Sequence, residues 1–139
     1  MSNILDELIN SEEEILEELI KIDNQVCHTN FCLEDLHKKE KIEINLLGDT
    51  LFITEGEPNT TIAILDELIA QPNNTYYLFV NQRFLALNKW LTTRFIELTN
   101  IRIELITDIN YNKFLKRDDL FIMPIGELAL VEQVKEDFL

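Results

Sequence analysis

After about residue 40, short apolar segments alternate with amphipathic segments, and this alternation constrains the fold more than any other feature of the sequence. The apolar segments are predicted strands at residues 50–54, 76–80, 101–106 and 120–123. The first two run apolar without a break, as strands covered on both faces do. The intervening segments repeat apolar residues at helical spacing, from about 60 to 70 and from 84 to 98, with a short one near 107–116 and a last one after 126.

Strands that take turns with helices over short connections indicate βαβ units and a mostly parallel sheet. We therefore predict an α/β fold with a Rossmann-like, three-layer arrangement. Residues 41–46 alternate apolar and polar side chains with period two, and Gly48-Asp49 can form a two-residue turn before the strand at 50–54. This pattern predicts an antiparallel hairpin at one edge of the sheet.

The first 26 residues predict two short helices. The apolar stripe predicted for the second helix consists of Ile15, Leu16, Leu19, Ile20 and Ile22. Ser11 followed by Glu14 has the spacing of a capping box at the start of the second helix. Residues 27–40 have the least periodicity and are interpreted as a connector. We therefore divide the chain into an N-terminal helical segment and connector, residues 1–40, and an α/β body, residues 41–139, within one compact domain.

The charge of the chain restricts its partners. It carries 26 acidic and 12 basic residues, a net charge of −14. Such a field repels nucleic-acid phosphates and anionic lipids, so we expect neither direct nucleic-acid binding nor membrane association. It favours a basic protein partner, although acidity also serves solubility alone.

The acidic excess is concentrated near the N-terminus. Residues 1–40 hold 11 acidic against 3 basic residues. Within the second predicted helix, four acids lie opposite the apolar stripe and form the candidate partner-binding face: Glu13, Glu14, Glu17 and Glu18. The alternative is a simple solvated helix surface.

The first residues contain neither a basic stretch nor an apolar stretch of the kind found in secretory signals, and no apolar run approaches the length of a membrane span. We expect a cytoplasmic protein in which Cys27 and Cys32 are reduced. These cysteines, with His28 and His37, form the one cluster that can be considered for zinc. The Cys-x4-Cys spacing fits a zinc site poorly, so we predict no metal and no cofactor.

In a parallel sheet, the loops that leave the carboxyl ends of the strands meet at one edge, where ligands of α/β proteins bind. The candidate ligand-binding residues at this edge are Glu55, Glu57, Asn59, Thr60, Asn81, Arg83 and Asp108. Arg83 can clamp an anion or can pair with a glutamate of the neighbouring loop. Gly56 precedes a predicted helix, but a single glycine forms neither a dinucleotide fingerprint nor a phosphate-binding loop.

No catalytic motif is present. The only serines are Ser2 and Ser11, and no Gly-x-Ser-x-Gly sequence occurs, which argues against a serine nucleophile. The sequence therefore favours a non-catalytic interaction domain that self-associates or binds a basic protein, as an inhibitor or an immunity protein does. The alternative is a small-molecule or nucleotide-related domain with a crevice at the carboxyl edge of the sheet.

Overall fold

A computed structural model describes residues 4–38, 40, 42, 44, 46–80, 83–106 and 118–125. In chain order its elements are α1 (Ile4–Ser11), α2 (Glu13–Cys27), the 3₁₀ helix η1 (Leu33–His37), β1 (Thr50–Ile53), α3 (Pro58–Leu68), β2 (Thr75–Phe79), α4 (Leu85–Thr99), β3 (Arg102–Ile106) and β4 (Phe121–Pro124). The prediction of an α/β fold is confirmed. The predicted helices near 107–116 and after 126 lie outside the described residues.

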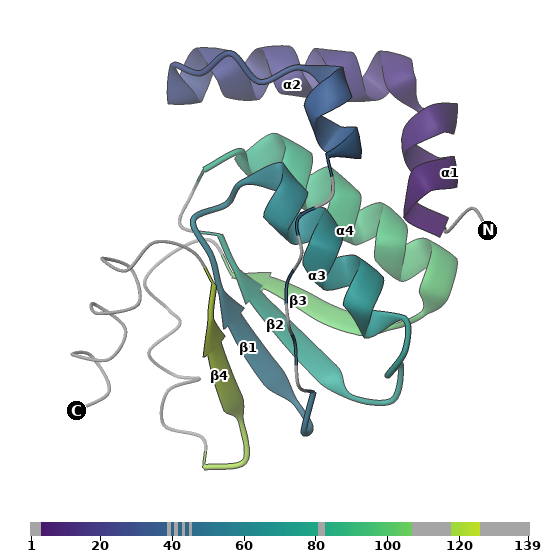
Figure 1. Cartoon of the computed structure of the whole chain (residues 1–139), viewed down its shortest axis with the longest axis vertical. Coiled ribbons are helices and arrows are strands. Elements are labelled where there is room, and N and C mark those ends of the chain that lie inside the picture. Colours follow the sequence, from purple (N-terminus) through teal and green to yellow (C-terminus); the bar gives the residue numbers. More distant parts are fainter. Residues whose placement is uncertain are drawn as a thin grey trace.

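The four strands form one sheet in the order β3-β2-β1-β4, and all pairs are parallel (Figure 1). Leu51 lies beside Tyr77 of β2 on one side and beside Ile122 of β4 on the other. All four residues of β1 are buried, as its unbroken apolar sequence predicts. The chain order reverses between β1 and β4, so the carboxyl end of β1 lies at the position where α/β sheets place ligands.

The predicted antiparallel hairpin is wrong. Both edges of β1 are already paired with parallel strands, so no place remains beside it for residues 41–46. The described residues of this segment belong to no strand, and Ile42, Ile44 and Leu46 instead pack against the main core. The apolar side chains of the period-two pattern at 42, 44 and 46 are partly buried. Apolar side chains can be buried on one side of a segment that is not hydrogen-bonded to a neighbouring strand. The described residues of this segment are an example.

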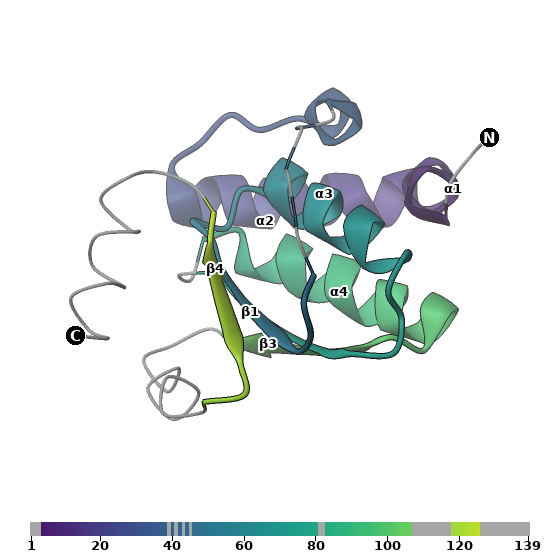
Figure 2. The ribbon, with the colours of Figure 1, turned by 60° about the horizontal axis from the view of Figure 1, so that its bottom comes forward.

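The described helices lie on one side of the sheet. Figure 2 shows α3 and α4 on this face, with α2 crossing on the side of α4 that faces away from the strands. These helices supply one of the two helical layers that a three-layer, Rossmann-like arrangement requires. None of the helices in the described ranges combines the length and the apolar character that a membrane crossing requires.

The N-terminal helices share their core with the sheet. Leu5, Ile9, Leu16 and Ile20 belong to the same buried cluster as Phe52, Tyr76 and Phe95, drawn from the strands and α4. A second cluster covers the other face of the sheet and includes Leu51, Ile53, Phe79, Ile106 and Leu120. The apolar face of α1 and α2 is therefore used in folding, and what remains exposed on α2 is a separate surface.

The predicted capping box at the start of α2 is not formed. The N-cap position is Glu12, which makes no capping hydrogen bond with its side chain, and the Ser11 hydroxyl donates to the backbone oxygen of Leu8 instead. Ser11 is therefore the last residue of α1, and α2 begins at Glu13, one residue later than a cap at Ser11 would place it.

Candidate functional site

The carboxyl edge of the sheet joins two of the predicted site residues. The guanidinium of Arg83, just before α4, lies 3.1 Å from a carboxylate oxygen of Glu57, which precedes α3. Their side chains are 44% and 39% exposed. The Arg83 guanidinium also stands 5.6 Å from the centre of the Phe84 ring. Arg83 therefore has an internal anionic partner and an aromatic neighbour, which reduces its availability for an external anion.

Gly56 fixes the distance between the two loops at this edge. Its φ is 91°, and a Cβ atom at this position would lie 2.6 Å from the backbone oxygens of Val80 and Arg83. The buried side chain of Asn88 links the loops further, because its Nδ2 donates to the backbone oxygens of Gly56 at 2.7 Å and Arg83 at 3.1 Å. Its Oδ1 accepts a 2.6 Å hydrogen bond from the Thr61 hydroxyl. The backbone of the loop after β1 is thus held against the backbone of the loop after β2.

The other predicted rim residues have different surroundings. Asn59 and Thr60, in the first turn of α3, are directed to the N-terminal connector. The Asn59 amide donates to the backbone oxygens of Asp35 and Lys38, and the Thr60 hydroxyl donates to Glu40 at 2.8 Å. Glu55 is partly buried in the loop after β1. Asn81 and Asp108 lie outside the described residues. The predicted set is therefore only partly brought together.

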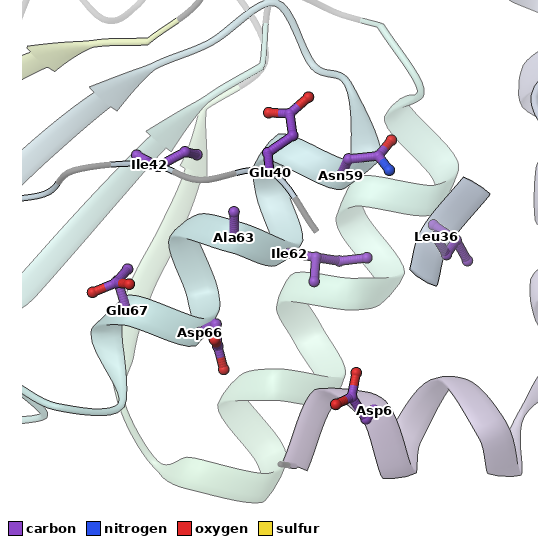
Figure 3. A pocket seen from close by; sticks show the side chains of 9 residues that line it. All are labelled: Asp6, Leu36, Glu40, Ile42, Asn59, Ile62, Ala63, Asp66 and Glu67. Atoms are coloured by element: carbon purple, nitrogen blue, oxygen red, sulfur yellow. The ribbon is translucent and has the colours of Figure 1, made fainter. Parts of the chain in front are cut away.

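A small pocket lies between α1, α3 and the connector (Figure 3). Its walls include Asp6 of α1, Glu40 of the connector and Asp66 and Glu67 of α3, around an apolar floor that contains Ile62. It leaves about 50 Å³ for water-sized atoms. Sites for small organic ligands occupy about 300 to 1,000 Å³, so this pocket is too small for a metabolite.

The cysteine and histidine residues of the connector do not converge. Cys27 ends α2, and His28 follows it in the left-handed conformation that terminates the helix, with a φ of 55°. The exposed Cys32 thiol donates to the Asp35 carboxylate at 3.1 Å. Among the residues that the structure describes, no group of three or more histidine, cysteine, aspartate or glutamate side chains is arranged to hold a metal ion.

The outer face of α2 presents apolar and acidic side chains together. Ile15, Ile22 and Val26 are 45%, 51% and 71% exposed. Their spacing of seven and four residues places them within about 40° of one another around the helix. We call these three residues the α2 stripe. Glu14 and Glu18 lie along one side of it, and they are exposed, as are Glu13 and Glu17.

The α2 stripe differs from the stripe that the sequence predicts. Leu16 and Ile20 are buried as expected, but Ile15 and Ile22 point outward. The apolar residues of α2 cover a wider arc than one neighbouring helix can bury. Asp23 lies within the buried face instead, at 3% exposure, and this position carried no signal in the sequence beyond an acid among apolar residues.

Comparison of the chain with known protein families, characterised proteins and solved structures finds no match.

Sequence reasoning missed three buried polar residues. Asp23 accepts hydrogen bonds from the start of α4, Asn88 joins the two loops at the carboxyl edge, and the hydroxyl of Thr92 has no hydrogen-bond partner among the described residues. Asn88 and Thr92 lie on the apolar face of α4, four residues apart, and polar residues at core positions were the only available signal.

Proposed function

We propose that this chain is a non-catalytic protein-interaction domain that binds a basic protein through the outer face of α2, as an inhibitor or an immunity protein does. The observation that carries the proposal is the α2 stripe, in which exposed Ile15, Ile22 and Val26 lie beside exposed Glu14 and Glu18. An apolar ridge next to charges of one sign is typical of a docking surface rather than of a solvated helix face.

The charge distribution supports a basic partner. The chain has a net charge of −14, and Glu14 and Glu18 of α2 lie beside the apolar residues that a partner would cover. Long-range attraction accelerates the encounter, and burial of the apolar side chains then slows dissociation. Salt affects the two contributions differently, because it screens the electrostatic attraction and does not screen the burial of apolar side chains.

The rim of the sheet gives less support to the alternative, a Rossmann-like domain with a ligand crevice. Glu57 and Arg83 pair with each other, and Asn59 and Thr60 bind the connector. This alternative has its own test, a thermal-shift screen of nucleotides and metabolites. A ligand that binds there raises the melting temperature by mass action, and Arg83→Ala removes the increase.

The experiment for the proposed function begins with an affinity pull-down at low salt, in which proteins that bind the immobilised chain are retained. The retained protein is identified by mass spectrometry, purified, and titrated against the wild-type chain by calorimetry. Ile22→Ser is expected to weaken binding about tenfold or more, because it removes a central apolar contact. Glu18→Lys is also expected to weaken binding, and the loss of affinity should be larger at low salt than at high salt.

Two matched variants control for nonspecific effects. Leu98→Ser removes an exposed apolar side chain from α4, and Glu67→Lys makes the same charge change on an exposed residue of α3. Both are expected to leave binding unchanged. Equal losses in the control variants, or no retained protein at any ionic strength, would contradict the proposal.

A further inference from the structure

The outer edge of β3 is open along the described chain. Within the described residues, the strand order is β3-β2-β1-β4, and β3 pairs with β2 alone. The backbone N–H of Val80 donates to the backbone oxygen of Ile106 at 3.3 Å, so the peptide groups of Ile106 face β2. Successive residues of a strand direct their backbone groups to opposite sides. The N–H and C=O groups of Ile103 and Leu105 therefore point away from the sheet.

A groove runs along this edge. It is lined by one face of α4, including Leu85, Thr92 and Ile96, and by Ile103 and Leu105 of β3, and it has a volume of about 450 Å³. Leu85 is 38% exposed. A helix beside a free strand edge is the arrangement in which an additional strand can be accommodated.

The groove also contains an unsatisfied polar atom. Thr92 is 3% exposed, yet its hydroxyl has no hydrogen-bond partner among the described residues. Buried polar groups in folded proteins are nearly always hydrogen-bonded. The open strand edge indicates that another segment completes this surface. The Thr92 hydroxyl lies beneath the surface and is not exposed to a docking segment.

The sequence of β3 is complementary to itself. In an antiparallel pair of two β3 strands, the outward-facing residues must lie opposite one another, so the twofold axis passes beside one of the residues from Arg102 to Leu105. With the axis at Arg102, two arginines face each other, and with the axis at Leu105, Glu104 lies opposite the apolar Ile106. With the axis at Glu104, two glutamates face each other. With the axis at Ile103, Arg102 of each copy lies directly opposite Glu104 of the other. Both Arg102 and Glu104 are exposed. The Nη2 group of Arg102 donates to the backbone oxygen of Asn73 at 2.8 Å, so the pair with Glu104 uses the other N–H groups of the guanidinium.

We propose that this chain forms a homodimer by antiparallel pairing of β3 strands about a twofold axis at Ile103. The two sheets become one continuous sheet of both copies, with α4 of each copy on the same face. Ile103 pairs with Ile103 of the second copy through two backbone hydrogen bonds, and Arg102 faces Glu104 twice. This surface is separate from the α2 stripe, so the dimer does not depend on the proposed function.

The test measures the mass of the chain in solution by sedimentation equilibrium and native mass spectrometry. We expect wild type to form a species of twice the 16.3 kDa monomer mass. Because two chains of charge −14 repel each other, dimerisation is expected to hold or strengthen as salt is raised, whereas binding of a basic partner through α2 weakens. Wild type that remains monomeric at millimolar concentration would overturn the proposal.

Charge substitutions test the register. Glu104→Arg places arginine opposite Arg102, and Arg102→Glu places glutamate opposite Glu104, so each single variant is expected to raise the dimer dissociation constant about tenfold or more. The exchange variant R102E/E104R restores complementary pairs and is expected to recover the dimer. Glu67→Arg, an equal charge change on α3, is the matched control and leaves dimerisation intact.

Mixing the two single variants provides the sharpest result. In a mixed dimer of Glu104→Arg with Arg102→Glu, every cross-strand pair is one arginine with one glutamate. The mixture is therefore expected to form heterodimers, distinguished by mass, although each variant alone is monomeric. Thermal unfolding confirms that each variant is folded. If the mixture remains monomeric, or if both single variants dimerise as wild type does, this interface is wrong.

Discussion

Asp23 of α2 accepts a 2.8 Å hydrogen bond from the backbone N–H of Leu87, in the first turn of α4. Its second carboxylate oxygen accepts from the N–H of Ala86 at 3.2 Å. Helix starts leave such N–H groups unpaired, and a side chain just before the helix usually satisfies them. Here that position is Phe84, which has a left-handed backbone with a φ of 49° and a buried ring. The cap therefore comes from another helix and fastens α2 to α4.

Loss of this remote cap is expected to destabilise the fold. Asp23→Ala leaves two N–H groups at a buried helix start without a partner and should lower the free energy of unfolding by about 2 kcal/mol. Asp23→Asn retains one acceptor and should cost less. Urea denaturation measures both, with exposed Glu17→Ala on the same helix as the control, expected within about 0.5 kcal/mol of wild type. A cost for Asp23→Ala no larger than that of the control would show that the cap contributes nothing.

The same carboxylate is expected to give stability a specific pH dependence. Burial raises the pKa of Asp23 above its ordinary value of 3.8, although the hydrogen bonds from Leu87 and Ala86 act in the opposite direction. The folded chain then binds the proton more tightly than the unfolded chain. The contribution of Asp23 is therefore complete below pH 3.8 and declines as the pH rises through the raised pKa.

Denaturation of wild type and Asp23→Asn across this range isolates the effect, because asparagine does not titrate. The stability of wild type relative to Asp23→Asn should fall from acid towards neutral pH. A relative stability that instead increases with pH would mean that the hydrogen bonds outweigh burial and that the pKa is lowered.

Gly56 is expected to tolerate no side chain. Gly56→Ala adds a methyl group 2.6 Å from two backbone oxygens at a φ of 91°, so it must separate the loops that Asn88 joins. Gly48→Ala is the matched control, because its φ of 151° also disfavours a side chain while its nearest neighbours are at 3.9 Å. We expect Gly56→Ala to cost about 3 kcal/mol and Gly48→Ala about 1 kcal/mol in thermal or urea unfolding. Equal costs would show that the close approach at Gly56 relaxes freely.

The Cys32 thiol is expected to react slowly for an exposed cysteine. Its hydrogen bond to the Asp35 carboxylate, reinforced by Glu34, raises its pKa above 9.0, and the thiolate is the reactive form. In a Cys27→Ser chain, where Cys32 is the only thiol, Asp35→Asn should accelerate alkylation by iodoacetamide several-fold at mildly alkaline pH. Glu17→Gln removes an equal charge elsewhere and should leave the rate unchanged. A rate insensitive to Asp35→Asn would remove the hydrogen bond as the cause.

Much of the architecture follows from local patterns. The four strands and the helices at α1, α2, α3 and α4 lie within a few residues of their predicted positions, because apolar runs and helical spacing are properties of neighbouring residues. The parallel sheet follows from the same alternation through the geometry of βαβ connections. The rim prediction identified Glu57 and Arg83 as neighbours for this reason.

Other features depend on contacts between distant segments. The segment before β1 has the alternation of a strand, but β1 has parallel partners on both sides, so Ile42 and Ile44 pack against the core without joining the sheet. The alternation of apolar and polar residues predicts which side chains are buried. It does not predict which element of the fold covers them. The same limit explains why Asn59 and Thr60 bind the connector instead of facing the rim.

The sequence by itself determined the type and order of the four strands and of α1 to α4, the parallel pairing of the strands and the acidic character of the chain, since these follow from residues close together or from composition. Only the tertiary structure decided that Asp23 caps α4, that Ile15 and Ile22 face outward, and that the backbone of Ile103 is directed to an open edge. Each of these features depends on which elements are neighbours in the fold. The local patterns are compatible with several arrangements of neighbours, and tertiary packing selects one of them.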